Sequence, residues 1–138
     1  MNFQNEDKDE LLRQWLEKAH RDIFAAENLI IHGEYISGIV AFLSQQAAEK
    51  YIKAYLVHEQ IEFPKTHDIG MLLKIVSKIN QNLSELLKDT ITLTDYSVDV
   101  RYPDDVPNIT LEDAKQAIEL AKKVREAILG ELPAFGNK

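Results

Sequence analysis

The sequence predicts an all-α protein, an up-and-down antiparallel bundle of four to five helices. Apolar residues recur at steps of three and four along almost the whole chain, which is the spacing of one helix face. No segment alternates apolar and polar residues as a strand would. With 138 residues, 45% of them hydrophobic, the chain can bury one core. We therefore expect a single domain at 1–138, with its bundle over about 11–129 and a frayed tail at 133–138.

The first two helices are predicted at 9–31 and 35–58. The first has a single apolar stripe and should end at Gly33, which suits a helix C-terminus. The second is apolar on more than one face, which is typical of the central helix of a bundle.

The other helices follow two breaks in the pattern. The first break lies at residues 60–65, because Pro64 cannot lie inside a helix. A third helix is therefore expected at 67–79, with Thr66 as its N-cap. A fourth helix is predicted to open at Asn82 and to reach about residue 98, although β-branched residues at 90–92 weaken it.

A proline-containing loop is expected at 101–108, where two prolines interrupt any periodicity. Thr110 is then predicted to cap a last helix that ends near Leu129.

Composition excludes several classes of function. The chain has no cysteine, which rules out disulfides, thiolate metal sites and cysteine nucleophiles. No apolar run is long enough to span a bilayer, and the first ten residues are acidic and polar, unlike a signal peptide. We therefore expect a cytoplasmic protein with no membrane contact. The net charge of −7 argues against non-specific duplex binding, which needs a broad basic face.

No metal or cofactor is predicted. Glu17 and His20 form one E-x-x-H pair on a helix, whereas di-iron bundles need two such pairs. No glycine-rich phosphate loop and no G-x-S-x-G nucleophile motif is present.

Polar residues in the middle of the second helix form the first candidate site. Gln46, Lys50 and Lys53 follow one another at about one turn, so they could line a groove that holds phosphate. The alternative is structural: Glu49 and Lys53 are four residues apart and could form a surface ion pair worth a few tenths of a kcal/mol.

The segment from Tyr96 to Asp104 is the second candidate, because it concentrates Arg101 with Tyr96 and Tyr102. Its structural alternative is a tie in which Arg101 pairs with a carboxylate and Tyr102 packs on the bundle.

Four motifs in this order resemble the HEPN (higher eukaryotes and prokaryotes nucleotide-binding) domain. They read W-L-E-K-A-x-x-D-I-x-A-A-E-x-L-I (15–30), Q-Q-A-A-E-K-Y-I-K-A-Y-L (45–56), P-K-T-H-D-I-x-x-L-L (64–73) and Y-x-x-x-x-R-Y-P-D (96–104). The resemblance implies a mostly antiparallel bundle that commonly forms a homodimer. It also implies a minimal nucleotidyltransferase encoded beside it, in toxin–antitoxin or related pairs, and nucleotide binding in some relatives.

Many relatives are implied to be metal-independent ribonucleases with an R-x4-6-H signature late in the domain. Arg101 occupies the arginine position, but no histidine follows His67 in this sequence. We therefore expect a non-catalytic binding module that engages ATP or GTP, or a nucleotidyltransferase-fold protein. The residues expected to bind are Gln46, Lys50, Lys53, His67, Tyr96, Arg101 and Tyr102.

Two alternatives remain. One is a ribonuclease toxin that cleaves RNA with Arg101 and a tyrosine, Tyr102 or Tyr96, in place of the histidine. The other is a bundle whose motif residues serve only as structural ties.

Overall fold

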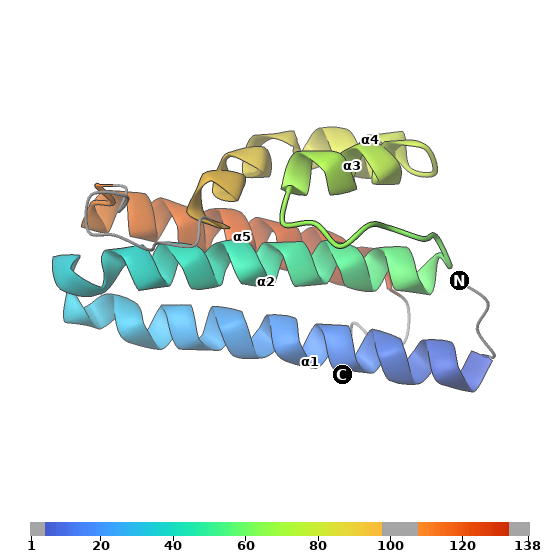
Figure 1. The fold of residues 1–138 in the computed structure, drawn as a ribbon, viewed down its shortest axis with the longest axis horizontal. Helices are drawn as coiled ribbons and strands as arrows, with labels where there is room; N and C mark the ends of the chain where they lie inside the picture. Colours follow the sequence, from blue (N-terminus) through green and yellow to red (C-terminus); the bar gives the residue numbers. More distant parts are fainter. Residues whose placement is uncertain (1–4, 98–107, 133–138) are drawn as a thin grey trace.

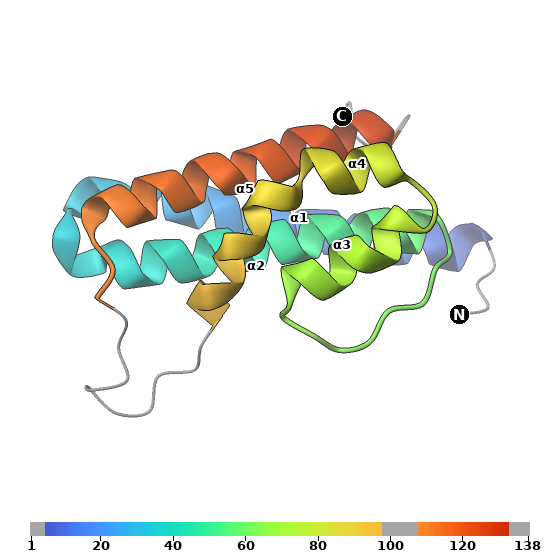
Figure 2. The same cartoon turned by 90° about the horizontal axis from the view of Figure 1, so that it is seen from above.

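A computed structural model describes residues 5–97 and 108–132 and confirms an all-α antiparallel bundle (Figure 1). The described residues contain no strand. Three long helices run side by side, and two short helices with a 3-10 segment form a further layer on them (Figures 1 and 2). The elements are α1 (Asn5–Leu29), η1 (Ile30–His32), η2 (Glu34–Ile36), α2 (Ser37–His58), α3 (Ile69–Ser77), α4 (Gln81–Leu86), η3 (Lys88–Ser97) and α5 (Leu111–Glu131).

Helix α2 is the centre of the fold, as its broad apolar surface predicts. It packs most extensively on α1 and α5, and it also contacts α3 and η3. Every residue from Tyr51 to Val57 is buried. In the described part of the chain, no helix is both long and apolar enough to cross a membrane.

The hairpin between α1 and α2 turns at Gly33, as expected. Its φ of 82° lies in the left-handed region, which glycine enters without steric cost. The predicted ends differ by a few residues, because 3-10 turns flank Gly33 on both sides and α1 already begins at Asn5.

The predicted N-cap of the third helix was wrong. Asp68, not Thr66, caps α3, since its side chain accepts a hydrogen bond from the Met71 N–H at 3.2 Å. Thr66 instead accepts from the Asp68 N–H at 3.0 Å, which shapes the turn before the helix.

The fourth helix is also not the single element predicted. Asn80, rather than Asn82, caps a short α4, and the chain then continues as the 3-10 segment η3. Hydroxyl groups in this segment bond back to the carbonyl three residues earlier: Thr90 to Leu87 at 2.6 Å and Thr92 to Asp89 at 3.2 Å. These bonds and the β-branched side chains favour the tighter 3-10 winding over a long α-helix.

The start of the last helix is confirmed. Thr110 and Asp113 form a complete capping box, and α5 ends two residues after the predicted Leu129. The expected loop at 101–108 is described only at residue 108, and the expected frayed tail at 133–138 lies outside the described residues.

Candidate functional site

A network of polar side chains joins α2 to the segment that precedes α3. Its centre is the Glu49 carboxylate, which accepts hydrogen bonds from Lys53 Nζ at 2.8 Å and from Gln45 Nε2 at 3.0 Å. His67 Nδ1 lies 2.8 Å from the same carboxylate. Because an ionised carboxylate only accepts, this histidine nitrogen carries the proton. Gln45 also donates to the His67 carbonyl at 3.1 Å, and Gln46 donates to Gln45 Oε1 at 2.6 Å.

The ion pair at the centre is buried, contrary to the surface pair that the spacing suggests. The Lys53 and Glu49 side chains are only 7% and 3% exposed. The Lys53 ammonium also lies over the rings of Trp15 and Phe63, at 5.5 and 5.8 Å from their centroids. Among the described residues, no buried side-chain nitrogen or oxygen lacks a partner. The network is therefore internally satisfied.

A sharp reversal of the chain after α2 brings the segment before α3 within reach of Glu49 and Lys53. Gln60 has a φ of 59°, which is rare for a residue with a side chain. The Ile61 N–H donates to the Leu56 carbonyl at 2.9 Å and closes the turn. The chain then runs back along α2, so that Phe63 and His67 reach Lys53 and Glu49 (Figure 1).

The Glu49 carboxyl has a pKa below its ordinary value. Burial alone would raise this pKa, but hydrogen bonds from Lys53, His67 and Gln45, with the charge of Lys53, outweigh burial and lower it. The folded protein therefore favours the ionised form of Glu49.

We expect this to make the protein sensitive to acid. Because the folded-state pKa of Glu49 lies below the ordinary value of 4.5, its contribution to stability is present above that pH and is lost as pH falls through the folded-state pKa. Urea unfolding from pH 7 to about pH 3 should show the stability gap between wild type and Glu49→Gln narrowing in acid. Glu17→Gln, at an exposed position, is the control, and a gap that stays constant would contradict the assignment.

The other predicted residues lie apart from this network. The Lys50 ammonium contacts the Asp22 carboxylate of α1 at 2.5 Å, and both side chains are largely buried. Tyr96 is half-buried against the core; burial, followed by the nearby Asp113 and Asp95 charges, raises the pKa of its hydroxyl. Arg101 and Tyr102 lie outside the described residues.

Comparison with known proteins identifies the family. The model of the HEPN domain matches residues 12–132. This chain belongs to the HEPN domain family. The crystal structure of an archaeal HEPN homologue matches it with a TM-score of 0.66 and 24% sequence identity, over 87% of this chain and 96% of that one. That likeness supports the fold. A search of curated proteins finds no match.

Sequence reasoning missed three members of the network in this HEPN chain: Gln45, Trp15 and Phe63. A signal for Gln45 was available, since Gln45, Glu49 and Lys53 stand four residues apart on one helix face. The contact between the Trp15 and Phe63 rings depends on the reversal at Gln60, and no local sequence pattern predicts this reversal.

A second polar contact went unpredicted at the α1–α2 interface. The buried Tyr51 hydroxyl lies 2.5 Å from His20 Nδ1. Burial raises the pKa of Tyr51, whereas burial and then the Arg125 charge lower the pKa of His20. The two shifts keep the Tyr51 hydroxyl protonated and favour the neutral form of the His20 imidazole.

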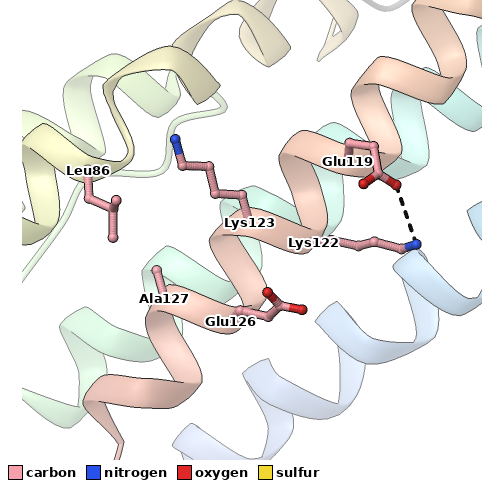
Figure 3. A pocket seen from close by; sticks show the side chains of 6 residues that line it. All are labelled: Leu86, Glu119, Lys122, Lys123, Glu126 and Ala127. Carbon is pink, nitrogen blue, oxygen red and sulfur yellow. Dashed lines mark ion pairs between the residues drawn. The ribbon is translucent and has the colours of Figure 1, made fainter.

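A hollow of about 410 Å³ between α4 and α5 contains none of the predicted site residues (Figure 3). It is lined by Leu86, Glu119, Lys122, Lys123, Glu126 and Ala127. Both of its lysines are already ion-paired, Lys123 to Asp89 at 2.9 Å and Lys122 to Glu119 at 3.4 Å. Across the described ranges, no group of three or more histidine, aspartate and glutamate side chains is arranged to hold a metal ion.

Proposed function

We propose that this HEPN chain is a non-catalytic binding module, acting as a homodimer, whose ligand is a nucleotidyltransferase-fold protein in a toxin–antitoxin-like pair. The observation that carries this proposal is the engagement of its two central lysines inside the protein. The Lys53 ammonium is bonded to Glu49, and that of Lys50 to Asp22. Each carboxylate would repel a phosphate group brought to its lysine.

The histidines also favour a binding role over RNA cleavage. In the described part of the chain, His67 Nδ1 is hydrogen-bonded to Glu49 and His20 Nδ1 to Tyr51, so both nitrogens have structural partners. No histidine follows Arg101 in the sequence to assist proton transfer. A protein partner therefore fits the chain better than RNA cleavage or nucleotide binding.

Co-purification tests the partner. The tagged chain, expressed in its source cells, should retain a nucleotidyltransferase-fold protein in a fixed ratio, whereas the tag alone should not. Calorimetry with millimolar ATP and GTP is the companion measurement, and we expect no heat of binding. Recovery of no such protein, together with saturable heat from either nucleotide, would replace the proposed partner with a nucleotide.

A further inference from the structure

The outer layer of the fold contains a stretch of sequence without an acidic residue. Residues 69–84 include α3, the turn after it and the start of α4. They contain Lys74 and Lys78 but no aspartate or glutamate, in a chain with 23 acidic residues and a net charge of −7. This stretch is therefore locally basic on an acidic protein.

Both lysines lie on the side of α3 that faces solvent. The residues with which α3 packs on the rest of the protein are buried: Ile69, Leu72, Leu73 and Val76. Met71, Lys74 and Lys78 follow at steps of three and four on the opposite side of the helix, and all three are exposed. Helix α3 packs against α2, α4 and η3, and no described element lies over it in Figure 2, where this layer is seen from above.

The two lysines have no carboxylate partner among the described residues. Exposed Lys88, by contrast, lies 3.8 Å from the Glu85 carboxylate. The carboxylate of Asp68, just before the helix, serves as the N-cap of α3. Because Lys74 and Lys78 are one turn apart, their charges repel each other, and a carboxylate brought between them would relieve this repulsion.

Exposed apolar side chains lie beside the lysines. Met71 is 44% exposed, and Ile91 of η3 is 38% exposed. Ile91 packs over Gly70, where an added Cβ would lie 3.5 Å from the Ile91 Cγ2 atom. Met71, Ile91, Lys74 and Lys78 are called the α3 surface below, which has an apolar part next to a basic part.

This combination fits an amphipathic helix that carries acidic residues. An apolar side chain of such a helix would pack on Met71 and Ile91, while its carboxylates would pair with the two lysines. Nucleic acids and anionic membranes fit less well, because they bind broad basic faces or clusters of four or more basic residues. The net charge of −7 also repels such extended polyanions.

We propose that the α3 surface is the docking site for an acidic amphipathic helix of the protein partner. The inference rests on the proposed function, because it requires a protein ligand. It adds the place at which that ligand docks and the charge that the ligand carries there.

Charge substitutions on the α3 surface test the docking site. The probe is the nucleotidyltransferase-fold protein that the tagged wild-type chain retains, purified and titrated against each variant by calorimetry. Lys74→Glu/Lys78→Glu should weaken its binding by roughly a hundredfold or more, because like charges then face each other, and Lys74→Gln/Lys78→Gln by roughly tenfold. Binding to wild type should also weaken as the salt concentration is raised from about 50 to about 300 mM.

The matched control is Lys18→Glu/Lys115→Glu. It changes the net charge by the same amount as Lys74→Glu/Lys78→Glu, at exposed positions of α1 and α5, and should bind as wild type does. All four lysines are exposed, so circular dichroism should report an unchanged fold in each variant. The glutamine variant adds no negative charge at the C-terminus of α3, where such a charge is unfavourable.

The outcomes separate this inference from the proposed function. Unchanged binding in both α3 variants, or equal weakening by the control, would overturn the docking site and leave the proposed partner in place. If wild type instead retains nucleic acid or a second copy of itself that the α3 variants lose, the surface has that occupant and the inference is overturned. A wild-type chain that retains no nucleotidyltransferase-fold protein would overturn the proposed function and the inference together.

Discussion

Replacement of Glu49 by alanine is expected to lower the free energy of unfolding by about 3–5 kcal/mol. The substitution leaves the buried Lys53 ammonium without its carboxylate and removes the acceptor for Gln45 and His67. An unpaired buried charge costs far more than the few tenths of a kcal/mol that an exposed pair contributes. Urea unfolding at pH 7 of wild type and Glu49→Ala measures the difference.

Two controls separate burial from charge. Glu17→Ala removes a carboxylate from an exposed pair with Arg21 at 3.7 Å, and its effect should stay below about 1 kcal/mol. The double variant Glu49→Leu/Lys53→Met removes both charges and should recover much of the lost stability. A Glu49→Ala effect as small as that of Glu17→Ala would show that the pair is not buried in solution.

Leu72→Ala is expected to destabilise the protein by about 2–5 kcal/mol. Leu72 is fully buried, and α3 has only nine residues with which to hold itself on the bundle. Its apolar face consists of Ile69, Leu72, Leu73 and Val76. Loss of one large member leaves a cavity under a helix too short to be stable alone. Thermal or urea unfolding of wild type and Leu72→Ala measures the loss of stability. Hydrogen exchange in the Leu72→Ala variant should show faster opening of α3 than of α1.

Met71→Ala is the matched control for this prediction. Met71 is the neighbouring residue of the same helix and is 44% exposed, so its truncation leaves no closed cavity. We expect a change below about 1 kcal/mol. Equal effects at the two positions would contradict the orientation of α3.

The fold could be predicted largely because its signals are local. The apolar stripe of α1, the positive φ of Gly33 and the capping box at Thr110 are each encoded within a few residues. The segment after Leu87 was mispredicted because helix periodicity persists there, while threonine hydroxyls bond to the backbone and favour a tighter turn.

The candidate site could be predicted only in part, because burial is a property of the whole fold. The sequence proposes Gln46, Lys53 and His67 as ligand-binding residues, and the structure brings these three into one internal network. It did not indicate that the Lys53 ammonium lies over the Phe63 ring, since that contact depends on the reversal at Gln60. A lysine predicted to face phosphate is therefore bonded to Glu49 within the protein.

An RNA-cleavage assay in EDTA, with wild type and Arg101→Ala side by side, tests most directly whether this HEPN chain works by binding alone. We predict that both proteins leave the RNA intact, because no histidine follows Arg101 to assist the proton transfer. Cleavage by wild type that disappears in Arg101→Ala would contradict the account and make the chain a ribonuclease.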